Sequence, residues 1–231
     1  MRLLLLSNST NYGGTFLGHA HDTIHEFLGM DVGEILFVPY AAVRFSFDAM
    51  SAKAAEVFGA LGYGMKSIHS VPNAPAAVEE AQAIAVAGGN TFQLLARLHQ
   101  EQLLDPIRER VREGVPYIGW SAGSNVACPT IRTTNDMPIT EPPSFDALGL
   151  VPFQINPHFT DGRIPNHGGE TRSERLLEFV AANPGMPVIG LREGSILQVE
   201  DDRVVLLGDA PAVLFKSGQE SQDIEPGQVE V

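Results

Sequence analysis

The chain has 231 residues, of which 44% are hydrophobic, and a formal net charge of −13 at pH 7. This length can bury a sizeable core, and we expect a single domain over residues 1–231. The negative charge repels phosphates and anionic lipids at long range, which disfavours nucleic acids and membranes as partners.

The chain starts with a charged residue and a short apolar run, residues 3–6. This run is too short for the core of a signal peptide and no small-residue cleavage site follows it, so we expect a first strand and no secretion. The longest apolar runs, such as Ile35 to Val43, are far below the roughly 20 residues that a membrane helix needs. Cys128 is the single cysteine, so an intramolecular disulfide is excluded. We expect its side chain to be buried and to pack like a small hydrophobic residue. Such a chain suits a reducing cytoplasm, as a monomer or homodimer.

The first half of the chain alternates between apolar β-rich runs and amphipathic segments. The expected strands are Leu3–Ser7, Ile35–Tyr40, Ser67–Val71, Ile84–Ala87 and Tyr117–Trp120. The expected helices are Phe16–Phe27, Phe47–Leu61, Thr91–Leu98, Pro106–Glu113 and, further along, Ser173–Ala182. This alternation predicts an α/β fold of three layers, in which helices cover both faces of a mostly parallel sheet.

The last third of the chain changes character. Short β runs are separated by turn residues at Val188–Leu191, Ser195–Val199, Val204–Leu207 and Ala212–Phe215. This pattern is typical of antiparallel hairpins, which we expect to complete the same sheet.

A strand-to-helix junction with paired glycines lies at Gly88-Gly89-Asn90. Such a junction presents backbone N–H groups in a cleft at the carboxyl ends of parallel strands. It lacks the lysine of a phosphate-binding loop, so phosphate binding is not predicted. Asn90 either caps the following helix or polarises a substrate, and the sequence leaves both roles open.

The strongest motif is the Gly-x-Ser-x-Gly pattern from Gly119 to Gly123, which follows a buried β run and precedes small residues. A serine at a sharp strand-to-helix turn is strained and tolerates only small neighbours, as in a nucleophile elbow. We therefore expect Ser121 to be a nucleophile, although a serine that merely caps the helix is the alternative. The N–H groups of Ala122 and Gly89 would then form the oxyanion hole.

Residues 128–149 form a long stretch with four prolines and no periodicity. Loops of this length within a compact domain are usually functional or disordered. Because the stretch joins the two strongest motifs, we expect it to form part of the active-site rim; a solvated surface loop is the alternative.

A serine nucleophile needs a base, and histidine is the usual one. His158 follows an apolar run and Pro157, at the end of a predicted strand, and is our candidate; His167, in a nearby Gly-rich loop, is the second choice. The spacing of three histidines in the first helical region could suggest a metal site, but no further ligands accompany them, and a solvated helix face is the simpler interpretation. These three are His19, His21 and His25. We expect His69 and His99 to occupy ordinary positions in a strand and a helix.

The third member of a serine triad is an acid that orients the imidazole. Two carboxylates qualify: Glu193, at a predicted strand end before a glycine, and Asp136, in the long loop. Position modestly favours Glu193. With Glu193 as the acid, the chain order is serine, histidine, acid. In α/β-hydrolases the order is serine, acid, histidine, so that fold would need Asp136 as the acid.

Arg172 follows Thr171, which with Glu174 resembles a capping box. This places a cation in the first helical turn, where it opposes the helix dipole. Arg172 either grips a substrate carboxylate or forms a weak surface pair with Glu170 or Glu174. A local arginine would be needed for an acidic substrate, because the overall charge repels one.

Several longer segments together resemble the peptidase E family of α-aspartyl dipeptidases, over nearly the whole chain. They are LLLLSNST, GGNTFQLL, GWSAGSN, IRTTNDMPI, QINPHF and GETR. The resemblance implies a class I glutamine amidotransferase-like (flavodoxin-like) fold and hydrolysis of Asp-X dipeptides without metal or cofactor.

By the same resemblance the triad would be Ser121, His158 and Glu193, with Gly89 and Ala122 as oxyanion donors. Arg172 would hold the aspartyl side chain, and Asn90 and Asp136 would also contact substrate. The three-glycine run of the family reads Ala87-Gly88-Gly89 here, and we expect the oxyanion hole to survive because Gly89 is retained.

Three rival functions stay open. A cyanophycinase-like enzyme on the same scaffold would cut β-linked Asp-Arg units and would favour an open cleft. A sensor of the same fold would bind Asp-X without turnover, against which the intact Ser121, His158 and Glu193 argue. An esterase of the α/β-hydrolase type would depend on Asp136 and not on Glu193.

Overall fold

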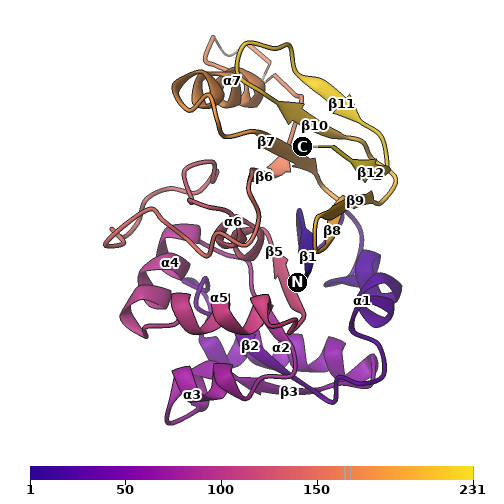
Figure 1. Cartoon of the computed structure of the whole chain (residues 1–231), viewed down its shortest axis with the longest axis vertical. Helices are drawn as coiled ribbons and strands as arrows, with labels where there is room; N and C mark the ends of the chain where they lie inside the picture. Colours follow the sequence, from indigo (N-terminus) through magenta and orange to yellow (C-terminus); the bar gives the residue numbers. More distant parts are fainter. Residues whose placement is uncertain (164, 167, 231) are drawn as a thin grey trace.

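The structure is a computed structural model that describes residues 1–163, 165–166 and 168–230. It has a mixed α/β fold with a large central sheet (Figure 1). The strands are β1 (Arg2–Leu6), β2 (Glu34–Val38), β3 (Gly64–Ser67), β4 (Ile84–Val86), β5 (Tyr117–Trp120), β6 (Gln154–Phe159), β7 (Val188–Arg192), β8 (Ile196–Glu200), β9 (Arg203–Leu207), β10 (Ala212–Phe215), β11 (Gln222–Ile224) and β12 (Gly227–Val229).

The helices are mostly short and amphipathic. They are α1 (His21–Leu28), α2 (Phe47–Ala60), α3 (Ala74–Glu79), α4 (Thr91–Gln100), α5 (Leu104–Arg112), α6 (Ala122–Ala127) and α7 (Arg172–Ala182), with the 3-10 turns η1 (Gly18–Ala20) and η2 (Ile68–Ser70). No helix among the described residues is long and apolar enough to cross a lipid bilayer.

The central sheet has eight strands in the order β12-β9-β8-β1-β5-β4-β2-β3. The strands from β1 to β3 in this order pair in parallel, and β8, β9 and β12 extend the sheet antiparallel from β1. The parallel part of the sheet agrees with the alternation of strands and helices that the sequence predicts, because parallel strands need crossover connections.

Alternate residues of β1 show how the layers form. Leu3 and Leu5 face one core, which α3, α4, α5 and α6 cover, whereas Leu4 and Leu6 face a second core with α1 and α2. All four side chains are fully buried. Side chains of successive strand residues point to opposite faces, so a strand that is apolar throughout requires cover on both sides.

A second, four-stranded sheet has the order β11-β10-β7-β6 and lies with α7 at the top of Figure 1. Leu176 and Val180 of α7 pack with Val188 and Phe215 over this sheet. The prediction that all the C-terminal hairpins complete one sheet is therefore wrong for Val188–Leu191 and Ala212–Phe215. The apolar pattern of a short strand indicates that it is buried but not which strand it joins.

The predicted strand Ser67–Val71 is also wrong, because β3 ends at Ser67 and the 3-10 turn η2 follows. The Ser70 hydroxyl donates to the Ser67 carbonyl at 2.8 Å, and His69 Nδ1 lies 2.7 Å from Ser67 Oγ. Such local hydrogen bonds from serine offer the backbone an alternative to a strand ladder.

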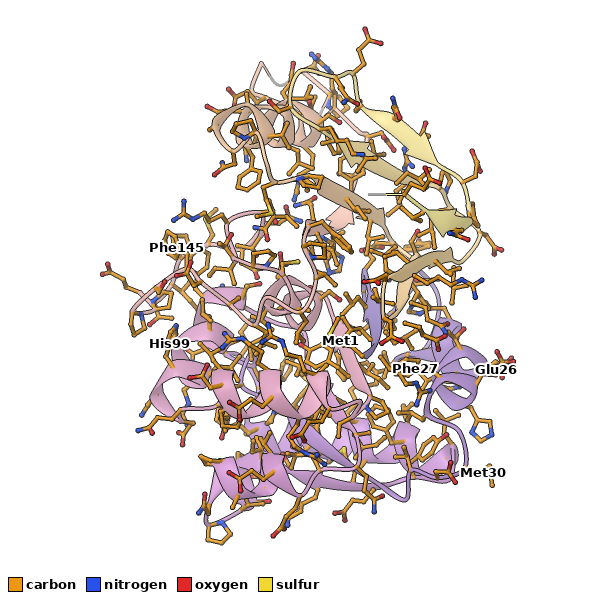
Figure 2. All side chains as sticks on the ribbon, viewed as in Figure 1. Met1, Glu26, Phe27, Met30, His99 and Phe145 are labelled. Atoms are coloured by element: carbon orange, nitrogen blue, oxygen red, sulfur yellow. The ribbon has the colours of Figure 1, made fainter. Side chains whose placement is uncertain are left out.

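Residues 128–149 hold no regular helix or strand, apart from a single bridge between Thr130 and Asp146. Phe145, labelled in Figure 2 near the outer edge of this segment, packs edge-on against Phe92 of α4 with ring centroids 6.1 Å apart. The segment is thus held against α4, at the carboxyl edge of the central sheet, where the predicted site residues lie.

Candidate active site

Ser121 lies at the turn from β5 to α6 with φ 52° and ψ −110°, a positive-φ conformation that is strained for a serine. The close packing around this turn requires the glycines that flank Ser121 in the sequence. A Cβ on Gly123 would lie 2.2 Å from the Val86 carbonyl oxygen, and one on Gly119 would lie 2.6 Å from the Gly123 backbone. The turn therefore has the geometry of a nucleophile elbow.

The His158 imidazole lies between Ser121 and Glu193. Its Nε2 is 3.0 Å from Ser121 Oγ and its Nδ1 is 2.7 Å from Glu193 Oε1. The side chains of His158 and Glu193 are 42% and 52% exposed, so the relay is open to solvent. These contacts form the continuous serine, histidine, carboxylate arrangement that nucleophilic catalysis uses.

A bulge in β6 aims the imidazole. The register between β6 and β7 shifts between Asn156 and Phe159, and His158 within this shift has φ 52°. Bulges of this kind redirect a side chain near an active site. The sequence predicts the strand end but gives no sign of the bulge.

Two polar residues after β1 hold this arrangement, and the sequence prediction missed them. Ser7 Oγ accepts the His158 N–H at 2.9 Å and donates to the Leu191 carbonyl of β7 at 2.8 Å. Asn8 Oδ1 accepts the N–H of Gly194, next to Glu193, at 2.8 Å. Buried polar residues at the carboxyl end of a parallel strand are the signal that would have identified them.

The two predicted oxyanion donors lie beside Ser121. Ala122 is the first residue of α6, so its N–H has no partner within the helix. Gly89 lines the same cavity as Ser121 and has φ 143°, and a Cβ there would lie 2.2 Å from the Ala41 carbonyl oxygen. Only glycine fits this close approach of two backbone segments.

Asp136 lies apart from the histidine relay. Its Oδ2 accepts the N–H and the hydroxyl of Thr91, at 2.8 and 2.6 Å, and no hydrogen bond or ion pair among the described residues joins it to His158. Asn90 caps α4, since its Oδ1 accepts the Gln93 N–H at 3.0 Å and its Nδ2 donates to the Met137 carbonyl at 2.9 Å. The capping role of Asn90, one of the two that the sequence left open, is therefore present.

A cavity of about 470 Å³ opens beside Ser121. Apolar residues from the loop after β1, from α2 and from the loop before α2 line it together with polar residues near the strand ends: Ser9, Phe16, Phe45, Ala49, Met50, Lys53, Gly88, Gly89, Trp120, Ser121, Asp136 and His158. Because Asp136 lines it, the segment 128–149 contributes to the rim, as predicted.

Arg172 is the first residue of α7, behind the predicted capping box of Thr171 and Glu174. Glu170 and Glu174 pair instead with Arg175 and Arg163, so neither of the surface pairs considered for Arg172 is present among the described residues. Burial, and then the charge of Arg175, lower the pKa of Arg172. It lines a second cavity, which shares Asp136 with the cavity of Ser121, but does not line the latter.

The model of peptidase family S51 matches residues 3–207. The chain belongs to peptidase family S51. It is 52% identical over 225 residues to peptidase E of Nostoc sp., covering 97% of this chain and 93% of the relative. It is 48% identical over 227 residues to peptidase E of Salmonella typhimurium, covering 98% and 99%.

A crystal structure of a peptidase from an acI-B1 Actinobacterium has the same fold, with a TM-score of 0.74 and 21% identity over 100% of this chain and 96% of that one. The predicted serine-type dipeptidase, a hydrolase, is confirmed by the family and its relatives.

The other histidines that the structure describes in this S51 peptidase lie outside the relay. His25 and His69 contact Tyr63 and Asp48, and His99 lies in α4. The solvated face expected in the first helical region is wrong for His19, because both of its ring nitrogens are buried without a partner. No metal-binding group of three His, Cys, Asp or Glu side chains occurs in the described residues, and His167, the second choice, lies outside them.

Cys128 is buried, as predicted, and burial raises the pKa of its thiol to about 12. Only the thiolate is strongly nucleophilic, so this cysteine is inert in the folded S51 peptidase.

Proposed function

We propose that this S51 peptidase hydrolyses dipeptides with N-terminal aspartate through an acyl-enzyme on Ser121. The observation that carries the proposal is the relay from Ser121 through His158 to Glu193, with distances of 3.0 and 2.7 Å. The resemblance to α-aspartyl dipeptidases supports the Asp-X substrate, and the relatives named peptidase E agree with it.

In the proposed reaction, His158 Nε2 takes the proton of Ser121 Oγ, and the oxygen attacks the carbonyl carbon of the Asp-X bond. The N–H groups of Gly89 and Ala122 stabilise the oxyanion. The imidazolium then gives its proton to the leaving amine, which departs as the free amino acid X. Water, deprotonated by His158, hydrolyses the aspartyl ester and regenerates Ser121. Glu193 orients the imidazole and stabilises its charged form.

For substrate recognition we propose three residues at the rim. Arg172 holds the aspartyl side chain, which the lack of a carboxylate partner among the described residues supports. Asp136 binds the substrate ammonium, since it lines the cavity of Ser121 and its Oδ1 accepts no hydrogen bond from the described residues. Asn90 keeps Asp136 in place through the neighbouring Met137 and contacts substrate beside it.

We also propose a class I glutamine amidotransferase-like, flavodoxin-like scaffold. A flavodoxin-like sheet has the strand order 2-1-3-4-5. If β2 is counted as its first strand, the run β3-β2-β4-β5 matches 2-1-3-4, and β1 takes the fifth place. We further propose that residues 1–231 form a single domain, that the protein is cytoplasmic, and that it is a monomer or homodimer.

The proposal is tested by hydrolysis of Asp-Leu, β-Asp-Leu, Asn-Leu and Leu-Leu, followed as free leucine. We expect cleavage of Asp-Leu alone. Ser121→Ala should lower kcat by about 10⁴-fold or more, because triad serines act as part of a unit. Ser221→Ala, at an exposed position directly before β11 and outside the residues that line the cavity, is the matched control and should retain full activity.

Three results would overturn the proposal. Wild-type activity in Ser121→Ala would remove the nucleophile, and cleavage of β-Asp-Leu in place of Asp-Leu would favour the cyanophycinase-like alternative. An intact Asp-Leu bound without release of leucine would favour the sensor.

A further inference from the structure

The cavity of Ser121 has an apolar wall that the proposed chemistry does not use. Phe16 packs edge-on against Trp120 with ring centroids 5.8 Å apart, and Trp120 directly precedes Ser121. Met50 of α2 lines the same wall. An apolar surface this close to the nucleophile suits a side chain of the substrate, and the aspartyl residue does not need it.

Lys53 brings a positive charge to this wall. It follows Ala49 by four residues on α2, so the two side chains share a helix face, and both line the cavity. Its Nζ lies 4.4 Å from the ring centroid of Phe16, a cation–π contact that fixes the ammonium over the wall. The ion pairs among the described residues do not include Lys53.

Opposite charges thus line one cavity. Of the described residues that line it, Asp136 is the only carboxylate and Lys53 the only permanently charged cation. A dipeptide carries an ammonium at one end and a carboxylate at the other, with the scissile bond between them. We infer that Lys53 binds the C-terminal carboxylate of the dipeptide, while the side chain of the leaving residue lies on Phe16, Met50 and Trp120.

This inference rests on the proposed function and deepens it, because it gives a physical reason for cleaving dipeptides. A substrate longer by one residue places a neutral peptide group opposite Lys53 and loses a charge-assisted hydrogen bond. Such bonds change binding by about 10- to 100-fold. Lys53 is a substrate-binding residue and takes no part in proton transfer.

The test is kcat/KM for Asp-Leu and for its C-terminal amide, with wild type and Lys53→Met. Methionine has an unbranched apolar chain that keeps the packing on Phe16 and removes only the charge. We expect Asp-Leu to lose about 10- to 100-fold and the amide to change by less than about threefold. Lys53→Arg keeps the charge and should restore most of the preference for the free acid.

Lys66→Met is the matched control, since Lys66 is an exposed lysine on β3 outside the cavity, and it should behave as wild type. The tripeptide Asp-Leu-Gly gives a second readout. Its kcat/KM should be lower than that of Asp-Leu in the wild type, and this difference should be smaller in Lys53→Met.

Equal losses for acid and amide, or no loss in Lys53→Met while Asp-Leu is still cleaved, would overturn the role of Lys53 and leave the proposed function intact. Failure of the wild type to cleave Asp-Leu, or an active Ser121→Ala, would overturn both.

Discussion

Replacing Glu193 with glutamine tests which carboxylate supports His158. The substitution keeps the size and a hydrogen-bond acceptor near His158 Nδ1, now 2.7 Å from Glu193 Oε1, but removes the negative charge. The transition state carries an imidazolium, so the lost interaction is one between opposite charges about 4 Å apart.

The magnitude follows from the exposure of the pair. Two charges at 4 Å interact by about 1 kcal/mol in water and by about 4 kcal/mol at an effective dielectric constant of 20. Because His158 and Glu193 are 42% and 52% exposed, the value lies between these limits. A loss of about 2 to 3 kcal/mol lowers kcat by about 30- to 150-fold.

The assay is steady-state hydrolysis of Asp-p-nitroanilide, with kcat and KM measured separately. Glu193→Gln should lower kcat and leave KM nearly unchanged, because the charge acts in the transition state. Asp136→Asn should instead raise KM, because in the proposed binding mode that carboxylate contacts the substrate ammonium and not the imidazole. A larger kcat loss in Asp136→Asn than in Glu193→Gln, at unchanged KM, would refute this assignment.

Three further predictions follow from backbone geometry and charge. Gly89→Ala places a Cβ 2.2 Å from the Ala41 carbonyl oxygen at φ 143°, so kcat should fall by about 100-fold and the melting temperature should fall as well; unchanged values of both would contradict this. The thiol of Cys128, with a pKa of about 12, should react with a disulfide reagent at pH 8 only after unfolding in urea, and rapid labelling of the folded protein would refute its burial. Hydrogen bonding from Arg192 lowers the pKa of Asp161, so its carboxylate stabilises the fold above the unfolded pKa and ceases to as pH falls through the folded value. Wild type should exceed Asp161→Asn in unfolding free energy at pH 7 by less than about 1 kcal/mol, and the difference should vanish as the pH falls below the folded pKa of Asp161.

The sequence predicts those parts of the fold in which local pattern and tertiary environment agree. Tyr117–Trp120 is apolar, ends at a Gly-flanked serine, and is a buried strand followed by a helix in the structure. The short strand β11 has the exposed sequence Gln-Asp-Ile, and α3 begins Ala-Pro and spans six residues, so neither carries a periodicity that could be read. Sheet membership of β7 and β10 depends on partners distant in the chain.

The site shows the same division. Ser121 and His158 could be identified because each ends a predicted strand with a local signature. Glu193 and Asp136 could not be separated with certainty from position, because both stand near strand ends and only three-dimensional proximity distinguishes them. Ser7 was missed because it bonds to His158 and to Leu191 of β7, which lie 151 and 184 residues away in the sequence, and no local pattern encodes such contacts.

The relay is assembled from both sheets. Ser121 follows a strand of the eight-stranded sheet, His158 belongs to the four-stranded sheet, and Glu193 lies in the short connection from β7 to β8 that passes from one to the other. The hydroxyl of Ser7 joins them by bonding to His158 and to Leu191. In the proposed mechanism, catalytic activity therefore depends on how the two sheets pack together. A substitution where the two sheets meet would then change the rate while every proposed reacting group stays the same.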